Sequence, residues 1–253
     1  MIGYHFKTQH SVRIAQLTDC HLLAAPEGMY QGVQPYHTLA AVLEAIKHSK
    51  LDALILTGDL TQDHSVASYQ HYLALLAEFS LPVFWLPGNH DDSQLMSTLF
   101  QQAPFRPEKQ LFAAGWQLLL LDSTGPTPAG YFPTTRLQSL QHQLQSDLRP
   151  CWLFAHHHPA PIGSSIDRHG WQDAEPFWQL LHQHTQVQGI AHGHCHHAYH
   201  RQLQGKNVVG CPATSVQFQQ TGVWQTLAVG PQWCEWTFTD QGNFSVDFKR
   251  IMP

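Results

Sequence analysis

The chain has 253 residues, of which 43% are hydrophobic, and it carries a formal charge of −5 with only 13 lysines and arginines. A single domain spanning residues 1–253 is ordinary for this length, which allows a sizeable core. Basic runs never exceed two residues, which argues against nucleic acid as a partner, since that binding depends on many phosphate contacts. No apolar run is long enough to span a membrane, and the first nine residues lack the apolar segment of a signal peptide, so we expect no membrane partner.

The first part of the chain alternates predicted strands and helices. Apolar residues recur at helical spacing in two segments, and short apolar runs precede and follow them. The expected order is strand 12–17, helix 36–48, strand 51–56, helix 65–79 and strand 81–86. This repetition is typical of parallel βαβ units in an α/β protein.

The same alternation continues and then changes. We expect a strand at 116–121, a helix at 134–147, a strand at 151–155, a helix at 174–184 and a strand at 188–191. Beyond residue 198, short runs broken by glycine and asparagine predict antiparallel strands at 206–209, 223–229, 234–238 and 245–248. Nothing in the composition marks a linker between domains.

Cysteine and histidine suggest the chemistry. The five cysteines lack the spacing of a disulfide framework or a cysteine-based zinc site, which predicts reduced thiols and a cytoplasmic location. Twenty histidines are unusual, because imidazole is the commonest metal ligand and the usual proton carrier near neutral pH. A histidine taken alone is most simply a surface residue, so only those in motifs carry an argument.

Five short motifs each follow a predicted strand. They are Asp19-Cys20-His21, Gly58-Asp59, Gly88-Asn89-His90-Asp91, His156-His157-His158-Pro159 and Gly193-His194-Cys195-His196. Ligands of open α/β sheets bind beyond the carboxyl ends of the strands, so these loops are expected to meet in one cleft. Carboxylates, an amide and imidazoles without a thiolate suit manganese, iron or zinc, in about the number that a two-metal site requires.

Spacing within the motifs suggests which side chains converge. On an extended segment, Asp19 and His21 point to the same side and Cys20 points away, and His194 and His196 repeat this arrangement. The same alternation lets only one or two residues of the 156–158 run reach an ion. Taken alone, the Asp19 motif is better explained by an ordinary turn beside a surface histidine.

Two further residues have candidate roles at such a site. Asp59 follows a glycine that permits a close turn, and it is a candidate bridge between two cations. His90 would stand beside the metals without binding them, where it could contact a phosphate oxygen or protonate a leaving alcohol. A hairpin-like turn is the alternative interpretation of the Gly88-Asn89 sequence.

The five motifs, in order across residues 19–196, resemble the pattern Asp-x-His, Gly-Asp, Gly-Asn-His, His and Gly-His-x-His of the calcineurin-like metallophosphoesterases. The resemblance implies two stacked mixed β-sheets flanked by α-helices, an αββα sandwich. A narrower resemblance is to the bacterial class III 3′,5′-cyclic AMP phosphodiesterases. It rests on residues 58–63, on Trp85-Leu86-Pro87-Gly88-Asn89-His90-Asp91, on the run 156–159 and on Thr214-Ser215-Val216-Gln217-Phe218.

This resemblance implies a specific site. One divalent metal would be held by Asp19, His21, Asp59 and His196, and the other by Asp59, Asn89, His156 and His194. Iron or manganese is expected first and zinc second. The substrate, a small cyclic nucleotide, would contact His21, Asp59, Asn89, His90, His156 and His196. A hydroxide between the metals would attack phosphorus to give 5′-AMP, with catalytic His90 stabilising or protonating the leaving group.

Several alternatives stay open at this point. The same chemistry could act on 2′,3′-cyclic nucleotides, glycerophosphodiesters or a nucleotide-linked lipid, because specificity is expected in the loops 23–36, 123–135 and 160–175. A non-catalytic scaffold of the same fold is a second class of function. Either Gln62 or Asp63 could orient His90. The resemblance also leaves a monomer or a homodimer open.

Overall fold

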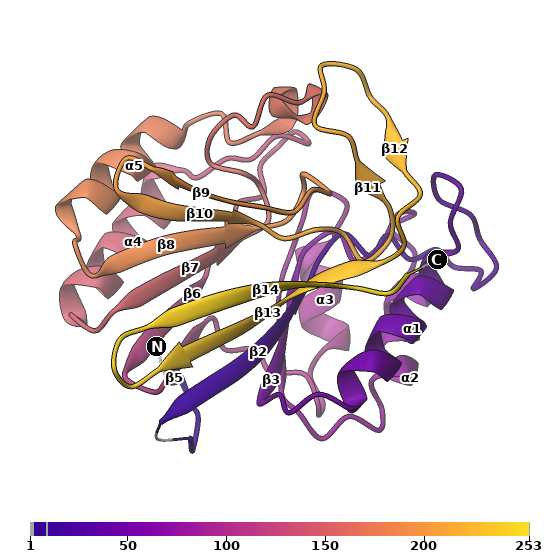
Figure 1. The fold of residues 1–253 in the computed structure, drawn as a ribbon, viewed down its shortest axis with the longest axis horizontal. Coiled ribbons are helices and arrows are strands. Elements are labelled where there is room, and N and C mark those ends of the chain that lie inside the picture. Colours follow the sequence, from indigo (N-terminus) through magenta and orange to yellow (C-terminus); the bar gives the residue numbers. More distant parts are fainter. Residues whose placement is uncertain (1–2, 9, 253) are drawn as a thin grey trace.

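The computed structural model describes residues 3–8 and 10–252, and two β-sheets packed face to face form its centre (Figure 1). The five-stranded sheet has the order β14-β13-β2-β3-β4, with β2, β3 and β4 parallel and β13 antiparallel to both β2 and β14. Its strands are β2 (Ser11–Leu17), β3 (Ala53–Thr57), β4 (Val83–Leu86), β13 (Gln232–Thr239) and β14 (Phe244–Arg250).

The second sheet has seven strands in the order β1-β5-β6-β7-β8-β10-β9. Strands β6, β7, β8 and β10 run parallel. Strand β5 is antiparallel to β6 and parallel to β1, and β9 is antiparallel to β10. The strands are β1 (Tyr4–His5), β5 (Gln110–Ala113), β6 (Trp116–Leu120), β7 (Cys151–Ala155), β8 (Val187–His192), β9 (Tyr199–Leu203) and β10 (Lys206–Gly210). A separate small hairpin pairs β11 (Gln217–Phe218) with β12 (Thr226–Leu227).

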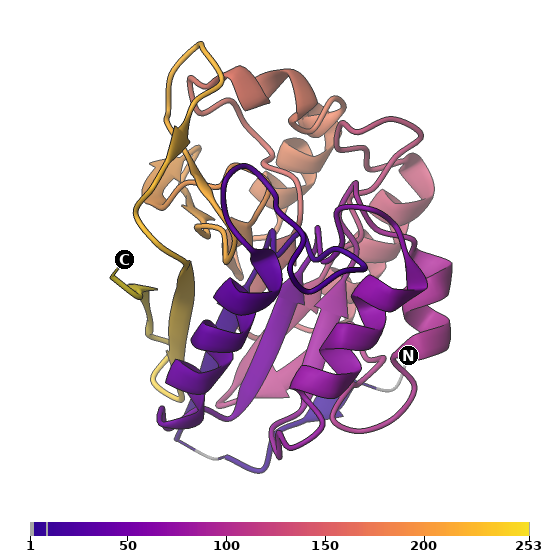
Figure 2. The same cartoon turned by 90° about the vertical axis from the view of Figure 1, so that its right-hand side faces the viewer.

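Helices cover the outer face of each sheet, as the two perpendicular views show (Figures 1 and 2). Helices α1 (Pro35–Lys47) and α2 (Val66–Leu75) cover the five-stranded sheet. Helices α4 (Thr134–Ser146) and α5 (Ala174–Gln183) cover the seven-stranded sheet. A short α3 (Ser93–Leu99) and a 3-10 helix, η1 (Ser165–His169), complete the set. The expected αββα sandwich is confirmed.

Strand alternation explains the layers. Ile14 and Ile55 lie in the core between the sheets, whereas Ala15 and Leu56 contact the helices outside. The second sheet behaves in the same way, with Trp152 facing inward. Because both faces of each central strand are buried, these strands are continuous apolar runs rather than alternating ones.

The predicted elements match the observed ones in the first part of the chain, with boundaries shifted by a few residues. Helix α3 was not expected, although Asp92 caps it by accepting hydrogen bonds from two backbone N–H groups at 2.9 Å. The strand expected at 223–229 is wrong, since only Thr226–Leu227 pairs there. Strand β10 pairs in parallel with β8, which corrects the expectation of purely antiparallel pairing. None of the helices among the described residues has the length and apolar character needed to cross a membrane.

Candidate metal centre

The five motif loops meet where strands of both sheets end. Asp19, Asp59 and Asn89 follow the carboxyl ends of β2, β3 and β4, and His156 and His194 follow those of β7 and β8. Apart from Asn89, these side chains are buried. The convergence expected from the strand positions is therefore present in the structure.

One cluster contains Asp19, His21 and His196. Nε2 of His196 lies 3.2 Å from Oδ1 of Asp19 and 3.1 Å from Nε2 of His21. Atoms that each bind one ion at about 2.1 Å are separated by roughly 3 Å, so this spacing suits a shared cation. Oδ2 of Asp19 already accepts hydrogen bonds from other groups, while its buried Oδ1 accepts none from the described residues.

A second cluster is centred on Nε2 of His156. That atom lies 3.2 Å from Oδ1 of Asn89, 3.2 Å from Nδ1 of His194 and 3.3 Å from Oδ1 of Asp59. Asp59 stands between the clusters, because its other oxygen, Oδ2, lies 3.8 Å from Nε2 of His21. The two oxygens of one carboxylate thus face two different sets of imidazoles.

Hydrogen bonds to backbone carbonyls orient two of these imidazoles. Nδ1–H of His156 donates to the carbonyl of Thr57 at 2.9 Å, and Nδ1–H of His196 donates to that of Val216 at 2.6 Å. Each bond leaves the lone pair of Nε2 directed at the cluster, which is how proteins orient metal-ligating histidines. The donor set and its hydrogen bonding therefore fit divalent metal ions.

The ionisation of the cluster also suits cations. Burial lowers the pKa of His21 to about 3, although the charge of Asp59 opposes the shift. Burial alone would raise the pKa of Asp59, but His156 and His21 outweigh it and hold that pKa well below its usual value. For His156, burial is outweighed by Asp59 and Asp19, which raise its pKa to about 9. Carboxylates are thus ionised, and an incoming cation would displace the proton that His156 holds.

The backbone at the ligand positions is left-handed rather than extended. Asp19, His21 and Asp59 have φ angles of 52°, 52° and 50°, and His194 and His196 have 65° and 47°. The expectation of extended segments was therefore wrong, although Asp19 and His21 do lie in one cluster. Such angles are costly for residues other than glycine and concentrate at functional sites.

The contacts around His90 bear on the question of whether Gln62 or Asp63 orients its ring. The backbone N–H of His90 donates to Oδ1 of Asp59 at 2.9 Å, and its ring stands edge-on to His21 with centroids 5.1 Å apart. The carboxylate of Asp63 instead accepts the N–H groups of Ala24 and Ser65, which fixes its own loop. Oε1 of Gln62 is buried and has no hydrogen-bond partner among the described residues.

Asp91 is a supporting residue whose role the sequence did not reveal. Its carboxylate accepts hydrogen bonds from the backbone of Leu60 at 3.1 Å and Gly88 at 2.9 Å, and from the hydroxyl of Tyr69 at 3.1 Å. It thereby joins the loop carrying Asp59 to the loop that carries Asn89 and His90.

The other histidines of the 156–158 run have polar partners outside the clusters. Nδ1 of His157 lies 2.9 Å from the hydroxyl of Ser123, and its Nε2 lies 3.2 Å from the carbonyl of Pro128. Nε2 of His158 lies 3.2 Å from Oδ1 of Asp167 on η1. His156 is central to the second cluster, and a ligand atom of His157 also lies within 4.8 Å of ligand atoms of His156 and His194, so one or two residues of this run adjoin the clusters, within the limit set by alternation.

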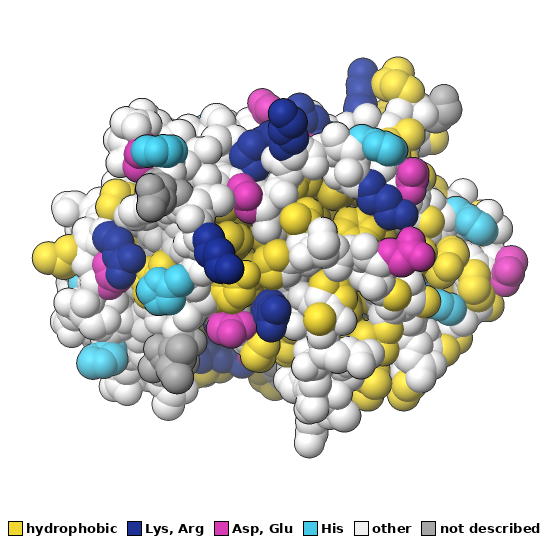
Figure 3. All heavy atoms as spheres, turned by 90° about the horizontal axis from the view of Figure 1, so that it is seen from below, with side chains coloured by type: hydrophobic (Ala, Val, Ile, Leu, Met, Phe, Trp, Pro, Cys, Tyr) yellow, Lys and Arg dark blue, Asp and Glu magenta, His cyan; other side chains and the backbone are white. Residues whose placement is uncertain are grey.

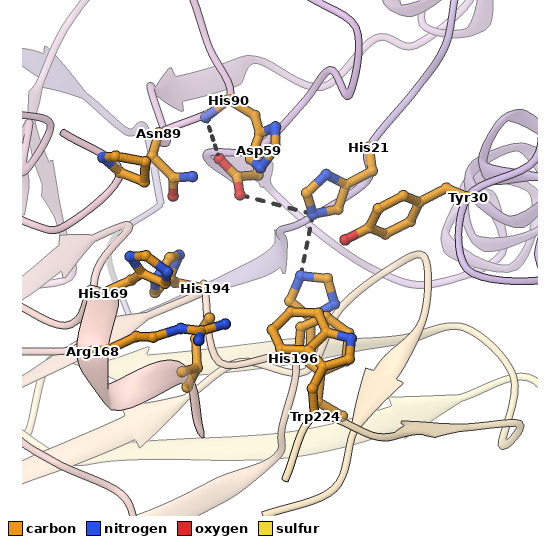
Figure 4. A pocket seen from close by; sticks show the side chains of 13 residues that line it. His21, Tyr30, Asp59, Asn89, His90, Arg168, His169, His194, His196 and Trp224 are labelled. Carbon is orange, nitrogen blue, oxygen red and sulfur yellow. Dashed lines mark hydrogen bonds and ion pairs between the residues drawn. The ribbon is translucent and has the colours of Figure 1, made fainter. Parts of the chain in front are cut away.

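A cavity of about 280 Å³ opens onto the two clusters (Figure 4). The expected specificity loops contribute Tyr30, Pro128, Ile166, Arg168 and His169 to its walls. His156 lies behind the cavity, fully buried, and does not line it.

Two aromatic residues of the β11–β12 hairpin, Phe218 and Trp224, also line the cavity. Sequence reasoning missed Trp224, because the segment around it was taken for a strand.

The surface carries no single basic field on the face seen in Figure 3, where lysines and arginines are spread out with acidic side chains among them. This distribution agrees with the small number of basic residues in the sequence.

Comparison with known proteins gives consistent results. The family model described as calcineurin-like phosphoesterase matches residues 12–198. A 3′,5′-cyclic adenosine monophosphate phosphodiesterase, CpdA, of Vibrio vulnificus is 36% identical, covering 96% of this chain and 92% of its own. The CpdA of Escherichia coli K12 is 35% identical, covering 95% and 90%. A dimetal phosphatase from Danio rerio, only 12% identical, shares the fold with a TM-score of 0.71, covering 94% and 96% of the two chains.

Proposed function

Because the chain belongs to the calcineurin-like phosphoesterase family, we propose that it is a two-metal phosphodiesterase that hydrolyses 3′,5′-cyclic AMP to 5′-AMP. The observation that carries the chemistry is the position of Asp59, whose two oxygens face separate imidazole clusters. The substrate is supported by the two relatives named as cyclic AMP phosphodiesterases, which match over nearly their whole length.

The proposed ligands divide into two sets that share Asp59. One ion would be held by Asp19, His21, Asp59 and His196, and the other by Asp59, Asn89, His156 and His194. Iron or manganese suits this mixture of oxygen and imidazole donors, and zinc is a further candidate. When bound, such ions neutralise phosphate charge and lower the pKa of a water molecule to generate the nucleophile.

The side chains around the cavity would then position the diester. Asn89, His21 and His196 line the cavity beside the clusters, where they can contact phosphate oxygens. Arg168 adds a permanent positive charge on the facing wall (Figure 4).

His90 is the proposed catalytic residue. Its half-buried ring lines the cavity next to His21, and the backbone bond to Asp59 fixes its position. An imidazole placed there can donate a proton to the leaving 3′ oxygen or stabilise the charge that develops on it.

The state of the cysteines supports a proposal for the cellular compartment of the enzyme. All five are buried and unpaired, which supports a reducing, cytoplasmic environment. A monomer and a homodimer are both compatible with the proposed chemistry, because every proposed ligand comes from one chain.

The test is hydrolysis of 3′,5′-cyclic AMP by the purified full chain after metal removal and reloading with Mn²⁺ or Fe²⁺. We expect metal-dependent formation of 5′-AMP, with bis-p-nitrophenyl phosphate as a generic diester alongside. Cleavage of the generic diester without any turnover of cyclic AMP would retain the two-metal chemistry and reject the substrate. Failure on both, with metals bound, would leave the non-catalytic scaffold.

A further inference from the structure

We propose that Trp224, in the loop that joins β11 to β12, is the specificity-determining residue that stacks against the nucleobase of the substrate. This inference rests on the proposed cyclic nucleotide activity. It concerns the part of the substrate that is remote from phosphorus, for which the metal clusters provide no contacts.

An aromatic platform leads from the metal centre to Trp224. The ring of Phe218 lies flat on the imidazole of His196, with centroids 4.0 Å apart and planes 9° apart. Trp224 follows, with its ring centroid 4.1 Å from that of Phe218. Trp224 and His196 both line the cavity (Figure 4). The indole thus lies within the length of a nucleotide from the clusters.

Trp224 is also partly exposed to solvent. Although it lines the cavity, 40% of the residue remains exposed to solvent. Large aromatic side chains are normally buried for the apolar area they remove from water, so an exposed one at a cavity wall is available to a planar ligand. Nucleobases stack on such faces.

The hairpin that carries the platform is fixed in place. The backbone N–H of Phe218 donates to the carbonyl of His196 at 2.9 Å, which ties the hairpin to a proposed metal ligand. The N–H of Ser165, on η1, donates to the carbonyl of Thr221 at 2.9 Å, which ties it to the facing wall. A surface that is already ordered loses little conformational entropy when a ligand binds.

The remaining walls favour a nucleotide over a glycerophosphodiester. Tyr30 stacks on His21 with centroids 4.4 Å apart, so a second aromatic ring flanks the centre. Among the described lining residues, Arg168 is the permanent cation and Asp59 the sole carboxylate. Aromatic faces with positive charge match a base joined to a phosphate, whereas a polyol would require several neutral donors and acceptors.

The experiment compares two ligands that differ in the base. Dissociation constants of 5′-AMP and ribose 5-phosphate are measured by calorimetry on the metal-loaded full chain. The wild type should bind 5′-AMP roughly 10- to 100-fold more tightly, the range expected for one base stacked on an aromatic ring. Trp224→Ala should reduce that ratio to below about threefold, and Trp224→Phe should restore part of it.

Val223→Ala is the matched control, because Val223 is the preceding residue, is 72% exposed and does not line the cavity. This variant should keep the wild-type ratio. An unchanged ratio in both Trp224 variants, with metal content and circular dichroism like those of the wild type, would overturn the inference. Failure of the proposed function is separate, because it appears as absence of 5′-AMP formation from cyclic AMP by the wild type.

Discussion

The backbone N–H of His194 donates a hydrogen bond to Oδ2 of Asp19 over 2.9 Å, although the two residues are 175 positions apart. The hydroxyl of Thr18 donates to the same oxygen at 2.8 Å. Because Oδ2 is occupied twice, Oδ1 is left facing the imidazole of His196. One carboxylate oxygen therefore holds two motifs together while the other is directed at the proposed ion.

Gly193→Ala should disrupt this arrangement. A Cβ at Gly193 would lie 2.0 Å from Oγ1 of Thr18 and 2.7 Å from Oδ2 of Asp19, so one of the loops must move. We expect metal affinity to fall roughly 10- to 100-fold, as when a partner of a ligand is lost, and the free energy of unfolding to fall by about 1–3 kcal/mol. Metal titration and denaturant unfolding measure the two effects.

Gly222→Ala provides the control for that substitution. Apart from its chain neighbours, no heavy atom lies within 4 Å of a Cβ at Gly222, and the residue is exposed. This variant should bind metal like the wild type. Wild-type metal affinity in Gly193→Ala would show that the contact between the Asp19 and His194 loops is not required.

His90→Ala should lower turnover without removing metal. The ring of His90 lines the cavity, but no proposed ligand set depends on it. We expect kcat to fall by roughly 10²–10⁴, the range for loss of a general acid, while metal content stays at the wild-type level. Elemental analysis beside steady-state kinetics checks both. Loss of an ion would instead assign His90 to metal binding.

Asp59→Ala should abolish occupancy by two tightly bound ions, because its oxygens face both clusters. The measurement is metal content per chain after equilibration with limiting Mn²⁺. Cys20→Ser is the control, since Cys20 lies between two proposed ligands but its buried side chain packs in the core under α1 and α2. Two tight ions persisting in Asp59→Ala would refute the bridging role.

Lys109 should give stability a pH dependence outside the metal centre. Burial lowers the pKa of Lys109 from 10.5 to about 7, although Asp122 and Glu108 oppose the shift. Its ammonium donates to the backbone carbonyl of Trp85 and lies over the ring of that residue. Between about pH 7 and 10.5 the unfolded chain therefore holds a proton that the folded chain has lost.

The free energy of unfolding should accordingly rise with pH through that window and be lowest, with respect to this group, below pH 7. Lys109→Met keeps most of the packing and removes the proton, so the difference in stability between variant and wild type should shrink as pH rises. Urea unfolding of both proteins from pH 6 to pH 10 gives this difference. A difference independent of pH would show that the lysine is charged in both states.

The sequence pattern was sufficient for the parallel strands and for the meeting of the five motifs, because buried parallel strands are recognisable as apolar runs and their carboxyl ends share an edge. The two-sheet sandwich was expected only from the family resemblance. It was not sufficient for the local geometry, since the left-handed angles at Asp19 and His194 depend on the packing of loops distant in sequence. The roles of Asp91 and Trp224 were also not predicted, because they too depend on contacts between segments distant in sequence or on a very short hairpin. Their roles come from tertiary hydrogen bonds and from a two-strand hairpin too short to give a periodic pattern.

The proposed ligands are divided between the two sheets: Asp19 and Asp59 follow strands of one, and His156 and His194 follow strands of the other. An ion bound by both groups would be a cross-link across the sandwich, so metal loading would contribute to the folding free energy. The melting temperature should therefore climb with ion concentration. In a cell that is short of metal, unfolding and degradation would lower the amount of the protein, and each remaining molecule would also be less active. The capacity to remove the substrate would therefore depend on metal supply through both effects.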